Sequence, residues 1–185
     1  MYPSNGIDWQ ADYDKLRNMP KHAIDSSGGA LLKGFPDAYV YSKRMAEEVM
    51  VKVNRRQASP VPMVIVRASI LAAADSEPMP GWTDTQGLLS GMTLAVGLGV
   101  MRDTLGNPES LLDIIPVDYV ARQLLVAAAY GRYRALQTQG REDLLVVQST
   151  TSASNPVSAG RFFAEIIKYQ NNFPYEKRAG PPSLT

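Results

Sequence analysis

The sequence predicts an α/β fold in which a small parallel sheet is flanked by helices. Segments with helical periodicity alternate with short apolar runs along the chain, which is the pattern of parallel sheets. The apolar runs are continuous rather than alternating, as expected for strands covered on both faces. Because only two or three such runs occur, the sheet would be too narrow to cover its own edges. We therefore expect a single incomplete domain over residues 1–185, completed by an upstream segment or by a second copy of the chain.

The composition excludes several classes of protein. The 185 residues are 45% hydrophobic and 20% charged, which supports a packed core and argues against general disorder. Nineteen basic and eighteen acidic residues leave a net charge of +1, so no global charge favours nucleic acid or an anionic membrane. The chain has no cysteine and one histidine, His22, which excludes disulfides and cysteine-rich or histidine-rich metal sites.

No segment of the sequence has the pattern of a secretory leader or a membrane span. The first residues lack the basic start and the apolar run of a leader. Residues 85–101 form a charge-free stretch that is just long enough to cross a bilayer, but its four glycines favour a buried segment of a soluble domain. We expect no transmembrane span, and the sequence leaves the compartment open between the cytoplasm and the periphery of an organelle membrane.

Residues 1–36 are expected to form an irregular lead-in. Turn-forming residues interrupt this part of the chain, and Gly28-Gly29 is the tightest cluster among them. A short helix near residues 13–19 is the only regular element that we expect there. His22 falls in this polar region and is expected to be solvated.

The clearest helix covers residues 39–57 and is followed by a strand. Apolar side chains recur at helical spacing through this segment, while charged side chains occupy its other faces. Asp37 is expected to cap the first turn. Pro60 ends the segment, and the apolar run over residues 61–66 predicts a strand covered on both faces.

The middle of the chain is predicted to be irregular before a second strand and helix. Residues 72–110 contain several prolines and glycines and show no clear period. Residues 112–115 predict a short strand, which ends at a proline. Asp118 is expected to cap a helix over residues 119–133, because apolar side chains recur on one face of that segment.

A last strand and a last helix complete the predicted order of elements. Residues 144–148 predict another buried strand. Asn155-Pro156 is typical of a helix cap followed by proline at the first helical position, which predicts a helix that ends near residue 169. Residues 171–185 are expected to form a loosely ordered tail.

Tyr39 and Lys43 carry the chemistry that the sequence indicates. Their four-residue spacing at the start of a helix places both side chains on one face, one turn apart. An ammonium beside a phenol favours the ionised form, which makes the phenol a usable general acid. Tyr41 lies only two residues from Lys43 and points elsewhere. The simpler alternative is a helix in which Tyr39 packs against the core and Lys43 is solvated.

Several short segments, in order along the chain, resemble one family of enzymes. Residues 37–47 (DAYVYSKRMAE) resemble the catalytic helix of extended short-chain dehydrogenases/reductases, and residues 64–70 resemble the strand that follows it in that family. Residues 77–84 (EPMPGWTD) are similar to the segment that marks fatty acyl-CoA reductases within this superfamily. Residues 113–120 (DIIPVDYV) and 154–157 (SNPV) also match those reductases.

The resemblance implies a Rossmann-like fold and a reductase activity. Residues 37–170 would form the catalytic-helix and substrate-side half of the domain, without its N-terminal nucleotide-binding βαβ unit. The implied reaction is hydride transfer from NADPH to a fatty acyl thioester such as fatty acyl-CoA, which gives an aldehyde and then a primary alcohol. The cofactor would supply the hydride, and the protein would supply orientation and a proton.

The same resemblance assigns roles to individual residues. Tyr39 would protonate the oxygen of the carbonyl group that is reduced. Lys43 would tune Tyr39 and hold the ribose of the nicotinamide. The other assigned residues border the cofactor or the substrate: Ala68, Ser69 and Ile70 beside the nicotinamide, and Gly81 and Trp82 beside the acyl substrate. The resemblance implies no metal ion.

Two other functions stay open at the level of the sequence. A dinucleotide site needs a glycine-rich turn between a strand and a helix, and neither Gly28-Gly29 nor Gly97-Leu98-Gly99 fits that pattern. A non-catalytic remnant or an interaction subunit is therefore one alternative. The other is a thioester reductase acting on acyl groups bound to a carrier protein, although the Gly81-Trp82 segment favours a CoA substrate.

Overall fold

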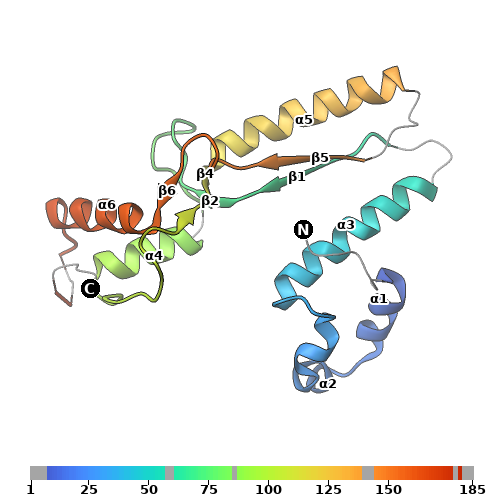
Figure 1. Ribbon diagram of the computed structural model, residues 1–185, viewed down its shortest axis with the longest axis horizontal. Coiled ribbons are helices and arrows are strands. Elements are labelled where there is room, and N and C mark those ends of the chain that lie inside the picture. Colours follow the sequence, from blue (N-terminus) through green and yellow to red (C-terminus); the bar gives the residue numbers. More distant parts are fainter. Residues whose placement is uncertain (1–7, 57–60, 85–86, 139–143, 177–178, 181–185) are drawn as a thin grey trace. The chain divides into compact units, whose positions relative to one another are not determined.

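The computed structural model describes residues 8–56, 61–84, 87–138, 144–176 and 179–180 (Figure 1). The chain divides into two compact units, and each is described by itself. Unit 1 comprises Met1–Ile65 and Arg134–Leu144, and unit 2 comprises Val66–Tyr133 and Leu145–Thr185. Unit 1 is mainly helical, whereas unit 2 combines short strands with helices, so the predicted α/β class is confirmed.

The described lead-in, residues 8–36, is mainly helical, so the prediction that it is irregular apart from one short helix near residues 13–19 is wrong. It contains α1 (Trp9–Asn18), α2 (Lys21–Ser26) and a 3-10 helix (Gly28–Leu32). The Asp8 carboxylate caps α1 by accepting hydrogen bonds from the backbone N–H groups of Gln10 and Ala11, at 3.2 and 3.4 Å. Trp9, Tyr13 and Leu16 recur at helical spacing in α1, and no residue of this helix is fully buried. His22 lies in α2 rather than in a loop.

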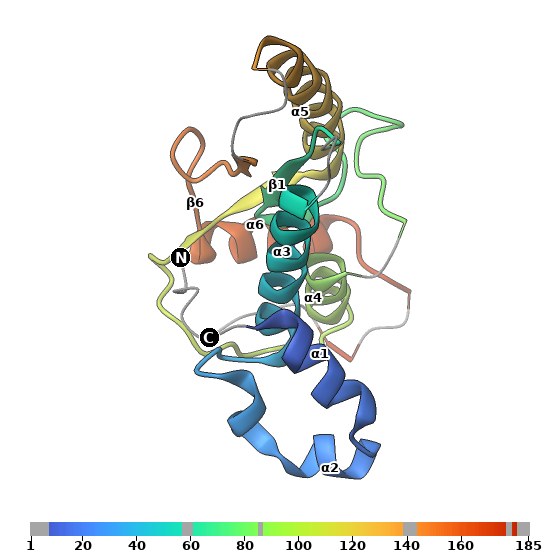
Figure 2. The same cartoon turned by 90° about the vertical axis from the view of Figure 1, so that its right-hand side faces the viewer.

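The helix predicted over residues 39–57 is α3 (Ala38–Arg56). A side-chain cap and a small aromatic core both stabilise its first turn. The Asp37 carboxylate accepts a hydrogen bond from the backbone N–H of Val40 at 2.7 Å, which confirms the predicted cap. Phe35 and Tyr41 form a buried core beneath this turn, with ring centroids 5.6 Å apart. Trp9 of α1 packs against that core, and α1 lies beside α3 (Figure 2).

The strands pair two by two in the part of the chain that the structure describes. The pairs are β1 (Val64–Ala68) with β5 (Leu145–Ser149), β2 (Ile70–Ala72) with β4 (Ile114–Pro116), and β3 (Leu111–Leu112) with β6 (Val157–Ser158). β2 and β4 are parallel, with Ile70 opposite Ile114, while β3 and β6 are antiparallel. The predicted strand over residues 61–66 begins later, at β1, and the predicted strand over residues 112–115 is divided between β3 and β4.

Ser69 separates β1, which pairs with β5, from β2, which pairs with β4. The backbone N–H of Ser69 donates to the carbonyl oxygen of Ser149 at 3.0 Å, at the carboxyl end of β5. The next N–H, of Ile70, donates to the carbonyl oxygen of Asp113 at 3.0 Å, just before β4. The carboxyl ends of β1 and β5 therefore lie side by side, and ligands of α/β proteins bind outside this edge of the sheet.

Three further helices are α4 (Leu88–Gly97), α5 (Val117–Gln137) and α6 (Ala159–Asn172). α4 lies in the region predicted to be irregular. The sequence gives no helical signal there, because an apolar helix without a polar face shows no amphipathic stripe. α6 begins after Ser158, whose hydroxyl accepts a hydrogen bond from the Arg161 N–H at 3.2 Å. Asn155-Pro156 therefore does not open this helix, because β6 intervenes. Within the described ranges, no helix is both long and apolar enough to cross a membrane.

Candidate active site

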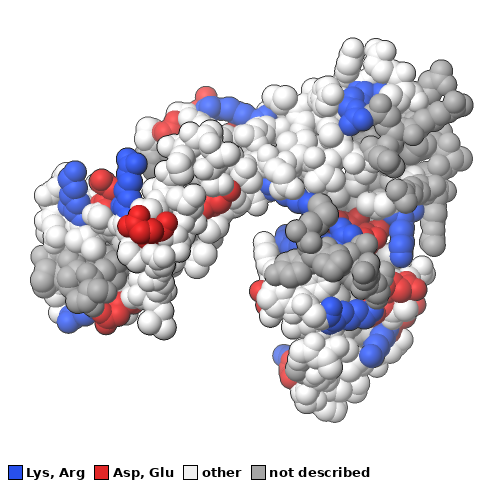
Figure 3. Space-filling view, in the orientation of Figure 1, with Lys and Arg blue, Asp and Glu red and all other residues white. Residues whose placement is uncertain are grey.

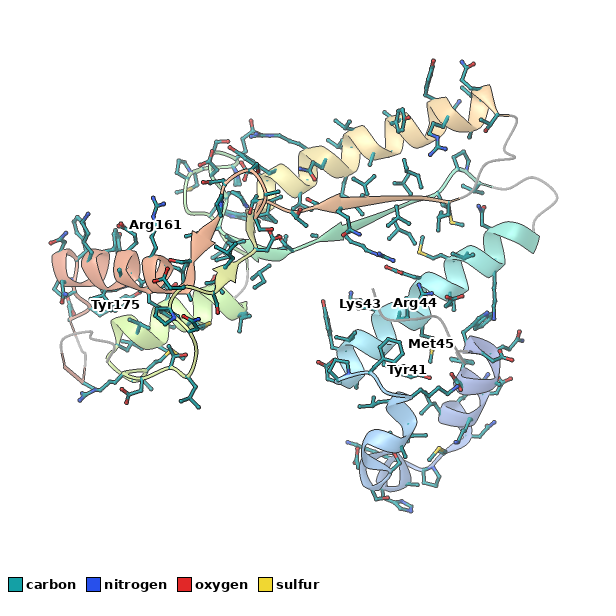
Figure 4. All side chains as sticks on the ribbon, viewed as in Figure 1. Tyr41, Lys43, Arg44, Met45, Arg161 and Tyr175 are labelled. Atoms are coloured by element: carbon teal, nitrogen blue, oxygen red, sulfur yellow. The ribbon has the colours of Figure 1, made fainter. Side chains whose placement is uncertain are left out.

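Tyr39 and Lys43 lie together on the first two turns of α3. The Nζ atom of Lys43 is 5.4 Å from the centroid of the Tyr39 ring, a distance at which an ammonium is attracted to an aromatic face. The Tyr39 side chain is 69% exposed, so the alternative in which it packs in the core is wrong. Lys43 is also exposed and projects from the first half of α3 (Figure 4). The one-turn arrangement expected from the spacing is therefore present, on the surface of unit 1.

Tyr41 is held in a different environment, although it lies only two residues from Tyr39. Its side chain is buried, and its hydroxyl donates a hydrogen bond to the Asp12 carboxylate at 2.8 Å. Burial and this carboxylate raise the pKa of Tyr41 to about 12. Burial alone would raise the pKa of Asp12, but hydrogen bonds from Lys33 and Tyr41 lower it. Tyr41 is therefore a structural group, which leaves Tyr39 as the accessible phenol beside Lys43.

Replacing Tyr41 with phenylalanine is expected to lower the free energy of unfolding by about 1.5 kcal/mol near pH 8, because the Asp12 carboxylate loses a buried donor. Since the pKa of Tyr41 is higher in the folded than in the unfolded chain, its stabilisation is complete below about pH 10 and is lost as the pH rises through about 12. Urea unfolding of both proteins at several pH values measures this difference. A difference that persists unchanged above about pH 11 would contradict the assignment.

Ala68, Ser69 and Ile70 occupy the carboxyl end of β1 and the start of β2. The backbone N–H groups of Ser69 and Ile70 are already used inside unit 2, where they donate to Ser149 and Asp113. Any contact of these two residues with a nicotinamide must therefore come from their carbonyl oxygens or side chains. The three residues belong to unit 2 and the Tyr39–Lys43 pair belongs to unit 1, so the structure supplies the two parts of the predicted site separately.

The described residues fit the nicotinamide end of a dinucleotide better than its pyrophosphate end. An exposed phenol and an exposed ammonium, one turn apart, have the donors that a ribose and a reducible carbonyl require. Gly29 lies in the 3-10 helix, and Gly97-Leu98-Gly99 is the end of α4. Neither forms a strand–turn–helix cradle, and the described ranges contain no other glycine-rich candidate for a phosphate.

Gly81 and Trp82 lie in a loop that follows β2 and closes on itself. The Ala74 N–H donates to the Trp82 carbonyl oxygen at 2.9 Å, and the Gly81 N–H donates to the Ala74 carbonyl oxygen at 2.8 Å. Gly81 has a φ of +81°, in the left-handed region that favours glycine. Trp82 is 38% exposed as a residue, and Met79 in the same loop is 60% exposed. Backbone hydrogen bonds therefore close the loop, while the side chains of Met79 and Trp82 are exposed to solvent.

Asp118 binds a distant loop, so the prediction that it caps a helix is wrong. Helix α5 already begins at Val117, and the Asp118 carboxylate turns instead toward the loop after β2. It accepts hydrogen bonds from the backbone N–H groups of Asp75, Ser76 and Glu77, at 3.0, 3.1 and 3.3 Å. Burial would raise the pKa of Asp118, but these bonds hold it far below its usual value. Its partners lie 41 to 43 residues away, so no local sequence signal could have identified them.

A partly open groove of about 560 Å³ lies in unit 2 between α4 and α6. Its lining is mainly apolar and comprises Thr93, Asn155, Pro156, Val157, Arg161, Phe162, Glu165, Ile166 and Tyr169. Leu89 and Val96, four residues before and three residues after Thr93 in α4, are buried in the core. The segment 91–96 therefore contributes both to the core and, through Thr93, to the groove.

Charged side chains form no large patch of one sign on the face shown in Figure 3, where basic and acidic groups are interspersed. Among the residues that the structure describes, no group of three or more histidine, aspartate or glutamate side chains is placed to hold a metal ion.

A comparison with known families matches residues 6–124 to a NAD-binding family described as male sterility protein. Among curated proteins, the chain is 29% identical to fatty acyl-CoA reductase 1 of Homo sapiens and 32% identical to that of Xenopus laevis. Both matches extend over 171 residues, which are 92% of this chain and 32% of each relative. A probable fatty acyl-CoA reductase 5 of Arabidopsis thaliana is 31% identical over 151 residues, 82% of this chain and 28% of that protein. The chain thus spans about a third of the length of these relatives.

Proposed function

Because the chain belongs to the male sterility protein family of NAD-binding domains, we propose that it forms the catalytic-helix and substrate-side part of an NADPH-dependent fatty acyl-CoA reductase. The observation that carries the proposal is the exposed Tyr39 with the Lys43 ammonium 5.4 Å from its ring centroid. The names of the curated relatives support a fatty acyl-CoA substrate. Residues 37–170 would constitute the working part of the chain.

Tyr39 would act as the general acid of this reaction. Its phenolic proton passes to the carbonyl oxygen as the carbonyl carbon is reduced, and the Lys43 ammonium stabilises the phenolate that remains. Bound NADPH supplies the hydride. In the first reduction the hydride would add to the thioester carbonyl carbon and the Tyr39 proton to its oxygen; the C–S bond would then break as that proton moves to the sulfur, which gives an aldehyde and the free CoA thiol. A second NADPH, with Tyr39 reprotonated from solvent, would convert the aldehyde into a primary alcohol. Lys43 would also hold the ribose of the cofactor through a hydrogen bond from its ammonium.

Trp82 and Gly81 would contact the acyl chain. The partly exposed indole ring offers a broad apolar surface, and Gly81 allows the tight turn that presents it. A long acyl chain gains free energy when its methylene groups leave water for such a surface. This assignment favours a CoA thioester of a fatty acid over a short polar substrate.

Calorimetry with NADPH and with NADH on the purified chain tests the proposal. We expect binding of NADPH at micromolar concentrations and consumption of NADPH when palmitoyl-CoA is added, and the NADH titration measures the preference between the two nucleotides. Consumption with a carrier-protein-bound acyl group but not with palmitoyl-CoA would indicate a thioester reductase instead. Absence of binding to either nucleotide by the folded chain would contradict the proposal and support a non-catalytic role.

A further inference from the structure

Asp118 is the centre of a buried network that joins the start of α5 to the loop after β2. Asp118 is 5% exposed, and both of its carboxylate oxygens accept hydrogen bonds from the loop. Oδ1 accepts from the N–H of Asp75, while Oδ2 accepts from the N–H groups of Ser76 and Glu77 and from the Ser76 hydroxyl. Three consecutive backbone donors that converge on one carboxylate define the path of that loop closely.

Neighbouring side chains of α5 reinforce the same attachment. The Tyr119 hydroxyl donates to the Asp75 carboxylate at 3.2 Å. A nitrogen of the Arg122 guanidinium donates to the Ser76 hydroxyl at 2.8 Å and lies 3.4 Å from Asp118 Oδ2. Tyr119 and Arg122 are more exposed than Asp118, so their bonds are weaker contributors to stability. The buried carboxylate is therefore the main point of attachment.

The attachment reaches Trp82 through the backbone of the loop. Ala74 immediately precedes the three residues that Asp118 binds, and it is hydrogen-bonded in both directions to Gly81 and Trp82. Apolar packing holds this loop only at Ala74, which is 4% exposed, while Met79 and Trp82 are largely or partly in solvent. The position of the indole ring thus depends on polar contacts more than on burial.

We propose that Asp118 is a positioning residue for substrate binding, which fixes the loop over residues 74–82 so that Trp82 meets the acyl chain. The inference rests on the proposed function only in the identity of the ligand. The position of the loop is a property of unit 2 alone. Asp118 does not itself touch the substrate in this account, and its replacement should therefore change acyl binding through the loop.

The test uses the full chain in a Trp9→Phe background, which leaves Trp82 as its only tryptophan. Asp118→Asn keeps the size of the side chain but replaces one acceptor oxygen by a donor group. We expect amide hydrogen exchange at Asp75, Ser76 and Glu77 to become at least about tenfold faster, and acrylamide to quench Trp82 more strongly. Binding of palmitoyl-CoA, followed by Trp82 fluorescence, should weaken about tenfold.

Asp113→Asn is the matched control, since Asp113 accepts hydrogen bonds from the Thr151 N–H at 2.9 Å and from the Ser152 hydroxyl at 2.8 Å, and none from the loop over residues 74–82. It should leave exchange at Asp75 and the quenching of Trp82 unchanged. Ser76→Ala is a milder second variant that removes one hydrogen bond to Asp118, and it should give smaller changes in the same direction.

Several outcomes would overturn the proposal. Unchanged exchange and quenching in both Asp118→Asn and Ser76→Ala would show that the carboxylate does not fix the loop. A released loop with unaltered affinity for palmitoyl-CoA would show that the loop does not position the ligand. If the parent chain binds no acyl-CoA at all, the proposed function fails as well, whereas exchange and quenching still report separately on the attachment of the loop.

Discussion

Replacing Tyr39 with phenylalanine is expected to lower kcat for the reduction of palmitoyl-CoA at least about 100-fold. The substitution removes the phenolic proton donor and leaves the exposed ring, and so the contact with Lys43, in place. The stability of unit 1 should hardly change, because the Tyr39 side chain contributes little to its core. NADPH consumption followed by absorbance, together with the thermal unfolding of the same protein, measures both quantities.

Tyr41→Phe provides the matched control on the same helix. It deletes the same atom from a buried tyrosine whose hydroxyl is bonded to Asp12, so it should lower stability and leave kcat unchanged. Lys43→Met should reduce turnover and weaken binding of NADPH, because the ammonium beside the phenol, and with it the proposed contact with the ribose, is lost. Full activity in Tyr39→Phe, or loss of activity only in Tyr41→Phe, would transfer the catalytic role away from Tyr39.

Replacing Gly97 with alanine is expected to lower the free energy of unfolding by about 1 to 3 kcal/mol, because the new methyl group has no room. A Cβ atom at this position would lie 2.6 Å from Cδ of Gln170 and 2.7 Å from a ring carbon of Tyr175. Gln170 is only 2% exposed and cannot swing into solvent. The substitution should therefore separate α4 from α6 and disturb the groove between them.

Gly91→Ala is the control for Gly97→Ala: it adds the same methyl group to α4 at a position without close neighbours, so it reports only the intrinsic preference of a helix for alanine. Both glycines belong to α4, but a Cβ atom at Gly91 would have nothing within 4 Å. Alanine there should raise the free energy of unfolding by about 0.5 to 1 kcal/mol. Urea titrations measure the free energy of unfolding of both variants. Equal effects of the two substitutions would contradict the close packing of α4 against α6.

Elements with a local signal could be predicted from the sequence, and α3 is the clearest example. Its apolar period and the carboxylate of Asp37 act within a few residues of each other, so the order of the amino acids alone reveals both. The spacing of Tyr39 and Lys43 is equally local, and it fixes their proximity once the segment is a helix. The resemblance to fatty acyl-CoA reductases is confirmed by the comparisons, while the roles of the site residues stay predictions.

Features that depend on distant partners could not be predicted. α4 is stabilised by burial against neighbouring elements, and without a polar face it shows no helical stripe. The sequence predicts α1 only in part, as a short helix near residues 13–19, because contact with the core at Phe35 also stabilises it and has no local signal. Asp118 resembles an ordinary helix cap in the sequence, because its hydrogen-bond partners come from a loop more than 40 residues earlier.

The most direct test of the role of Tyr39 uses NADPH that carries deuterium in place of the hydrogen transferred as hydride. The purified chain is incubated with this cofactor and palmitoyl-CoA, and the deuterium content of the aldehyde and alcohol products is measured by mass spectrometry. We predict deuterium at the former carbonyl carbon with the parent chain, and almost none with Tyr39→Phe. A parent chain that binds NADPH and yields no labelled product, or a Tyr39→Phe variant that yields as much label as the parent, would contradict the account.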